Sequence, residues 1–175
     1  MNARDEFIRE WNVVNNAFEN PSMDDTIKYK RCGDFIVQMK RMQDTKDNEM
    51  RAKVVDARYA KFRANKLMVM RILDTLSNVF VDSIKHSYKH IYGDIPIEYR
   101  VGKIALPNGF EDNVDIICAE GIHYFNTLFA AYCYVRNEVM NSNENGTFFC
   151  FGPTLSRRQA QEWFARHFHQ FYVHC

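Results

Sequence analysis

The sequence predicts an α+β protein in which an N-terminal helical lead is followed by a small mixed sheet domain with packed helices. The first observation is the distribution of turn-forming residues: between Ser22 and His90 there is no proline and a single glycine, whereas both recur afterwards. Glycine and proline are typical of turns and loops, so their scarcity favours helix. The second observation is that short runs of strand composition begin only near Lys66. We therefore predict a helical arm over residues 1–60 and a compact α+β domain over residues 61–175.

Two helices are predicted in the arm. The first covers about residues 4–20 and ends at Asn20-Pro21, because proline cannot continue a helix. The second begins near Met23–Asp25 and continues past Met42. Apolar residues in the first helix recur at spacings of four, three and four, which is the spacing of one helical face: Phe7, Trp11, Val14 and Phe18. We expect this stripe to contact neighbouring subunits.

The second part alternates short apolar runs with turn signals. Its predicted elements are strands within 67–73, 80–84 and 95–106, a turn at Pro107-Asn108-Gly109, a helix over Thr127–Val139, a strand over Thr147–Phe151 and a last helix that starts at Ser156. The last helix has a capping-box sequence, Ser156-x-x-Gln159, at its start.

Composition narrows the class of protein. The chain has 175 residues, of which 46% are apolar and 26% charged, so it can bury a core of its own. It contains no run of 18 apolar residues, and its charged N-terminus has no apolar core of a signal peptide, so we expect a soluble intracellular protein without a membrane span. The five cysteines are widely spaced and an odd number, which favours reduced thiols. The tail residues that could suggest a metal fit no zinc spacing, and we predict no metal site: His167, His169, His174 and Cys175.

Four short motifs stand out in the second part. They are Lys61–Lys66 (KFRANK), Tyr99–Lys103 (YRVGK), Pro107–Asn113 (PNGFEDN) and Cys118–Phe125 (CAEGIHYF), followed by Ala130 and Tyr132. Taken alone, their glycines are predicted at tight backbone positions, and His123 is predicted to be a hydrogen-bonded structural ring.

Together these motifs resemble an uncharacterised domain family of large double-stranded-DNA viruses of algae and protists. That family reads R-A-x-K, Y-x-x-G-K, P-x-x-F-x-x-N, C-x-x-G-I-H-F-F and A-x-x-Y in order. The resemblance covers about Lys61–Tyr134, and Tyr124 stands where the family usually has phenylalanine. It implies a viral origin and supplies no activity.

The first functional hypothesis is a non-enzymatic structural or interaction protein, most specifically a minor capsid protein. The sequence has no glycine-rich phosphate loop, metalloprotease helix or nucleophile elbow. We predict no cofactor and no small-molecule ligand, and other viral proteins, including capsid subunits, as partners. The predicted location is the virion, and the host cytoplasm during assembly. The candidate binding residues are Phe7, Trp11, Val14, Phe18, Lys40, Arg41, Arg100, His123 and Tyr124.

The second hypothesis is an enzyme of the ADP-ribosyltransferase type. Tyr99-Arg100-x-Gly102 followed by Gly121–Phe125 is similar to the Y-R-G and G-I-Y-F layout of that fold. The resemblance implies that Arg100 and His123 orient a dinucleotide and that Tyr124 stacks on nicotinamide. A carboxylate would then stabilise an oxocarbenium-like transition state, with three candidates: Glu138, Glu144 and Glu162.

The third hypothesis is nucleic-acid binding through a basic segment. Residues 26–71 contain 13 lysines and arginines against 5 acidic residues, interleaved with Tyr29, Tyr59 and Phe62. Cations can neutralise phosphates and aromatic rings can stack on bases. However, the isoelectric point of about 7.7 is below that of typical nucleic-acid-binding domains. We therefore prefer the first hypothesis.

Overall fold

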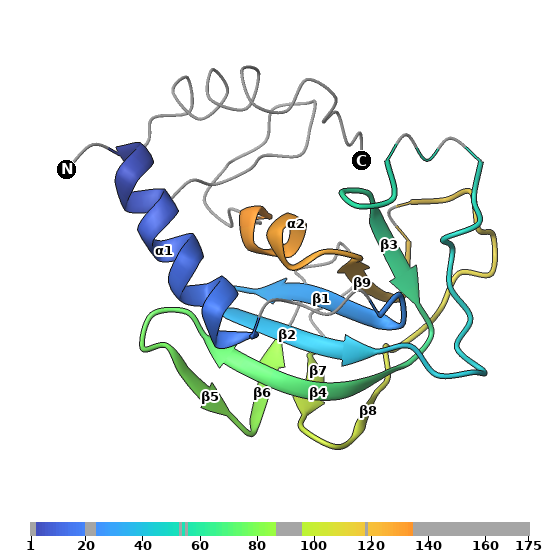
Figure 1. Ribbon diagram of the computed structural model, residues 1–175. Helices are drawn as coiled ribbons and strands as arrows, with labels where there is room; N and C mark the ends of the chain where they lie inside the picture. The colour runs from blue at the N-terminus through green and yellow to red at the C-terminus, as the bar shows by residue number, and fades with distance from the viewer. Residues whose placement is uncertain are drawn as a thin grey trace, which may run out of the picture.

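The chain forms an α+β fold in which an N-terminal helix precedes a curled antiparallel sheet and a second helix, as the sequence predicts (Figure 1). The computed structural model describes residues 3–19, 24–52, 54, 56–86, 96–117 and 119–134. The elements are α1 (Ala3–Ala17), β1 (Ile27–Cys32), β2 (Phe35–Lys40), β3 (Lys61–Ala64), β4 (Leu67–Asp74), β5 (Val79–Val81), β6 (Ser83–His86), β7 (Ile97–Arg100), β8 (Ile104–Ala105), β9 (Ile122–Phe125) and α2 (Leu128–Cys133).

One large sheet organises the described part of the molecule. Its strands lie in the order β3-β9-β1-β2-β4-β5, and β8 also pairs with β4. Every pairing is antiparallel, and β6 and β7 form a separate two-stranded sheet. The two strands from before residue 60, β1 and β2, lie between strands from after it, so the predicted division at that residue passes through a single sheet.

The predicted second helix, from Met23–Asp25 to past Met42, is wrong. This segment is a β-hairpin in which Cys32 pairs with Phe35 across the two-residue turn Gly33-Asp34. Gly33 has φ +58°, a backbone conformation that glycine adopts without steric cost. In the sequence, the only indication of this hairpin is a single glycine, Gly33, between the two six-residue segments that form β1 and β2.

The two faces of the large sheet are covered differently. Residues of α1 and α2 pack on one face, where the core includes Phe18, Tyr29, Leu73 and Phe125. The opposite core has no helical residue among its members and includes Tyr99 of β7. Met70 is the extra residue of a β-bulge in β4, since Met39 pairs with Val69 and Gln38 with Arg71. The bulge keeps Val69 and Ile72 in the same core despite their odd spacing.

Several other local predictions are confirmed. The first helix covers Ala3–Ala17, and the apolar run at 67–73 lies within β4. The predicted helix at Thr127 has Thr127 as its N-cap, but the predicted extent to Val139 is wrong, because the helix ends at Cys133, where Tyr134 has an extended backbone and caps it. The predicted strand over Thr147–Phe151, the last helix from Ser156 and the histidine-rich tail lie outside the described residues. Within the described residues, no helix has the length and apolar character needed to cross a membrane.

Candidate functional site

Alternate residues of β1 carry lysine side chains into the interior of the protein. Lys28 and Lys30 are both 2% exposed, and they lie on the sheet face opposite Tyr29, as the two-residue period of a strand requires. The Lys30 ammonium donates to the backbone carbonyl of His123 at 2.9 Å. A buried ammonium is strongly unfavourable without hydrogen-bonding partners, so the surrounding groups must compensate for its lost hydration.

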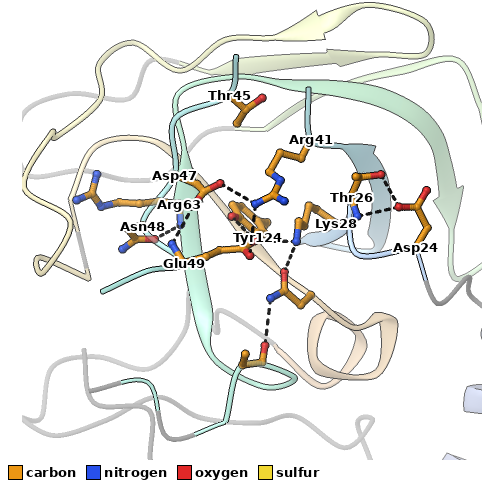
Figure 2. A network of polar contacts seen from close by, with 12 residues as sticks. Asp24, Thr26, Lys28, Arg41, Thr45, Asp47, Asn48, Glu49, Arg63 and Tyr124 are labelled. Atoms are coloured by element: carbon orange, nitrogen blue, oxygen red, sulfur yellow. Dashed lines mark hydrogen bonds and ion pairs between the residues drawn. The ribbon is translucent and has the colours of Figure 1, made fainter. Parts of the chain in front are cut away.

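Glu49 is the central acceptor of the network around Lys28 (Figure 2). Its Oε1 atom lies 2.7 Å from the Lys28 ammonium and accepts a hydrogen bond of 2.8 Å from the Tyr124 hydroxyl. Its Oε2 atom lies 3.7 Å from the Arg41 guanidinium, which also contacts Asp47 at 3.3 Å. Burial, together with Glu49, raises the pKa of the Tyr124 hydroxyl, which is therefore held as a neutral donor.

Asn126 is a second hydrogen-bond acceptor for the Lys28 ammonium. Its Oδ1 atom accepts from Lys28 at 2.7 Å, and its amide donates to the Ala57 carbonyl at 3.3 Å. The contacts of Glu49 and Asn126 thus attach the long connection between β2 and β3 to the strands β1 and β9. The network has an evident structural role, which is to hold an irregular segment against the sheet.

Arg63 is a second buried hub, at the edge strand β3. Its side chain is fully buried, and its guanidinium donates to the backbone carbonyls of Glu111, Asn113 and Ile116. The ring of Phe110 lies against the guanidinium, 5.0 Å from centroid to carbon. Burial lowers the pKa of this arginine, although an arginine remains charged at neutral pH.

Three of the four sequence motifs therefore converge around Arg63. The PNGFEDN segment wraps its guanidinium, and the CAEGIHYF segment supplies β9, which pairs with β3. Gly121 has φ +143°, and a Cβ atom there would lie 3.3 Å from both Arg63 Cβ and the Ala64 carbonyl. Packing and backbone conformation thus explain why these residue types occur in the motifs. Gly121 occupies a tight backbone position, as the sequence predicts for the motif glycines.

The predicted stripe on α1 faces the interior of the protein itself. The exposed fractions of Phe7, Val14 and Phe18 are 6%, 3% and 2%. Trp11 is partly buried and packs against the same core, with its ring edge-on to Phe129. Three of the four side chains are consequently buried within this chain, where they cannot form the proposed contact with a neighbouring subunit.

The three residues suggested for dinucleotide chemistry lie in different environments. Arg100 is exposed on β7 and forms an ion pair with Glu98 at 2.9 Å. Tyr124 is fully buried, and His123 is half-buried with Nε2 2.8 Å from the Ala119 carbonyl. The histidine is thus a hydrogen-bonded structural ring, as the sequence predicts. The structure does not place Arg100 and Tyr124 at a common surface.

The basic segment 26–71 is partly turned inward. Five of its twelve described cationic side chains are buried: Lys28, Lys30, Arg51, Lys61 and Arg63. Of the two candidate binding residues in this segment, Lys40 is exposed at the end of β2, and Arg41 is half-buried in the Glu49 network. Part of the charge excess in the sequence is therefore internal and does not contribute to a basic surface.

Sequence reasoning missed an exposed apolar surface, which we call the outer margin. It consists of β4 together with β5, β8 and the adjoining turns, because β5 and β8 both pair with the same edge of β4. Seven of the twelve exposed large apolar side chains among the described residues belong to it: Met70, Leu76, Val79, Phe80, Val101, Ile104 and Leu106. No local pattern marks these residues, since their grouping depends on the pairing of separate segments.

The fold and these networks define a small α+β domain with a curled antiparallel sheet. Helices cover one face of the sheet, and on the other the ion pairs and hydrogen bonds of Glu49 and Arg63 hold the long connections in place. The chain belongs to a family of unknown function, DUF5758, whose sequence model matches residues 16–131. This match includes all nine described strands and begins well before the Lys61 motif. Neither the curated proteins nor the solved structures contain a match to the chain.

Proposed function

We propose that this protein is a non-enzymatic interaction protein that binds another protein subunit through the outer margin. The observation that carries the proposal is the gathering of exposed apolar side chains along one edge of the sheet. The exposed fractions of Leu76, Leu106 and Val79 are 78%, 63% and 56%. Large exposed apolar patches on monomers commonly mark sites of association, because covering them removes apolar surface from water.

The partner in this proposal is another component of a large DNA virus particle, with this protein as a minor capsid or other virion component. The viral context is supported by the resemblance of the motif set to a domain family of such viruses. The outer margin supports contact with a protein, since its side chains are those that protein interfaces bury at their centres.

The enzymatic alternative receives less support from the contacts of its candidate residues. The Tyr124 hydroxyl is bonded to Glu49 inside the protein, and the His123 ring is bonded to the Ala119 carbonyl. A residue that stacks on a nicotinamide must reach the ligand, which a fully buried tyrosine cannot do without rearrangement of the sheet. Nucleic-acid binding is likewise less favoured because five cations of the basic segment are buried.

The test is quantitative mass spectrometry of purified virus particles washed with salt and detergent. We expect the wild-type protein at a fixed ratio to the major capsid protein. The double variant Leu76→Lys, Leu106→Lys should be strongly depleted from particles, because it places two charges in the outer margin. The control is Val13→Lys, which changes a 41% exposed apolar residue on α1.

Two results would overturn this proposal. One is absence of the wild-type protein from washed particles although it is present in infected cells. The other is incorporation of the double variant at the wild-type ratio.

A further inference from the structure

Two long connections that are far apart in the sequence lie side by side beyond β3 (Figure 1). They are the segments 41–52 and 107–117, and we call them together the loop platform. The Asn48 amide donates to the Val114 carbonyl at 3.3 Å, and Lys46 lies 3.6 Å from Asp112. Asn48 is fully buried and also accepts from the backbone N–H of Arg63 at 2.8 Å.

Internal contacts fix the shape of the loop platform. Arg63 binds three carbonyl groups of the second segment, and the Glu49 network attaches the first segment to the sheet. A surface held in one conformation before binding loses little conformational entropy when a partner binds to it. The platform therefore meets the structural requirement for a preformed binding surface.

Three apolar side chains project from this surface. Met50 stands in a tight turn in which the Arg51 N–H donates to the Asn48 carbonyl, and its side chain is 92% exposed. Ile116 and Val114, on the neighbouring segment, are 42% and 40% exposed. A flexible thioether and two branched aliphatic residues on one platform suit the binding of an apolar side chain from a partner.

The second segment of the platform is acidic, whereas the first carries equal numbers of acidic and basic residues. Residues 107–117 contain three acidic residues and no lysine, arginine or histidine. Asp112 and Asp115 are both exposed, and the side chain of Asp112 is 79% exposed even with its ion pair to Lys46. On the other segment the Asp44 side chain is 72% exposed, but it forms an ion pair with Lys66.

We propose that the loop platform binds a segment of a partner protein that presents an apolar side chain flanked by lysine or arginine. The inference goes beyond the proposed function, because the loop platform is a second surface that shares no residue with the outer margin. The apolar residue of the partner is buried on Met50, Val114 and Ile116, while its basic residues face Asp112 and Asp115. An apolar centre with a charged rim is the common organisation of protein interfaces, and opposite charges at the rim favour encounter and register.

The test is a selection of binders to the immobilised full-length protein from a displayed library of random peptides. We expect enrichment of peptides that carry leucine, methionine or phenylalanine next to lysine or arginine. Synthetic versions of these peptides should lose about tenfold or more in affinity for Met50→Glu, because truncating or charging a central anchor has effects of this size. Asp112→Lys should weaken the same peptides, and added salt should weaken them as well.

Matched controls change equally exposed residues elsewhere. Leu76→Glu alters the outer margin and Asp34→Lys alters the β1–β2 turn, and both residues are exposed. Neither should change peptide affinity. Unchanged melting temperatures would show that the variants remain folded, as expected for side chains outside the core.

Each result of the selection bears on the proposal. Failure to enrich any peptide, enrichment of acidic peptides, or equal binding to Met50→Glu and wild type would overturn it. These results would leave the outer-margin proposal standing, because that proposal depends on particle incorporation and on Leu76 and Leu106. Conversely, the protein could be absent from washed particles while selected peptides still bind it in a Met50-dependent way. That combination would overturn the outer-margin proposal and support the loop-platform proposal.

Discussion

Lys28 illustrates how a lysine can occupy the interior of a sheet. Its ammonium contacts the Glu49 carboxylate and the Asn126 carbonyl oxygen, each at 2.7 Å, and lies over the Tyr124 ring at 5.7 Å. Each contact replaces part of the hydration that the charge loses on burial. The cost of an uncompensated buried charge is large, so the arrangement depends on every partner being present.

Glu49→Gln tests this dependence at the level of single residues. The substitution keeps the shape of the side chain but leaves the 2% exposed Lys28 without its counter-charge. Removing one partner of a buried pair typically costs about 3–5 kcal/mol, and because Glu49 is only partly buried we expect about 2–3 kcal/mol. Urea unfolding measures the change. The control is Glu98→Gln, whose exposed pair with Arg100 should contribute less than about 1 kcal/mol. Equal losses in the two variants would contradict the assigned role of Glu49.

At the level of elements, the irregular connections depend on the strands beneath them. Residues 107–117 have no strand partner of their own. Instead, the Arg63 guanidinium of β3 donates hydrogen bonds to three of their backbone carbonyl groups. Buried backbone carbonyls require hydrogen bonds, and one guanidinium can supply several donors in a fixed geometry. A single side chain therefore acts as the main attachment of a whole segment.

Arg63→Met should release that segment. Methionine fills similar volume without donors, so we expect a loss of roughly 3 kcal/mol in the free energy of unfolding. Amide hydrogen exchange should accelerate in residues 107–117 while the β1–β2 hairpin changes much less. Arg58→Met is the control, because the Arg58 side chain is 71% exposed and its described side-chain contacts are only with the nearby residues Asp56 and Tyr59. Unchanged exchange in residues 107–117 would show that other contacts hold them.

At the level of the whole molecule, α1 is part of the domain core. Phe18, just after its last helical residue, has its ring edge-on to Tyr29 and Phe80, and the Arg71 guanidinium lies over it at 5.5 Å. The rings of Phe7 and Tyr132 lie 5.7 Å apart at the other end of the helix. The helix thus covers one face of the sheet together with α2, which is a different role from that of a detachable arm.

Phe18→Ala measures how strongly the helix belongs to the domain. A large-to-small substitution at a 2% exposed phenylalanine should cost about 3–5 kcal/mol. Val13→Ala, at a 41% exposed position of the same helix, should change stability by less than about 0.5 kcal/mol. Thermal or urea unfolding of both variants makes the comparison. A small effect of Phe18→Ala would support an independent helical arm.

Local periodicity was sufficient to predict part of the fold. The 4-3-4 spacing in α1, the apolar run of β4 and the tight positions of Gly102 and Gly121 each depend on a few neighbouring residues. The sequence pattern predicts a helix in place of the β1–β2 hairpin, because Lys28, Lys30 and Gln38 interrupt the apolar pattern that a buried strand normally shows. The candidate site was predicted poorly, since burial of the α1 stripe and of Tyr124 follows from what packs over them.

The α+β class, the first helix and the motif residues with special backbone positions can be predicted from the sequence, because they follow from short-range sterics and hydrophobic spacing. Which charges are internal and which apolar residues remain exposed depends instead on the tertiary structure. Lys28 can be buried because Asn126, 98 positions away, reaches its ammonium. Likewise, the outer margin exists because β5 and β8 pair with one edge of β4. Burial of a charge and exposure of an apolar group are properties of contacts between distant segments, and such contacts form only when the chain folds.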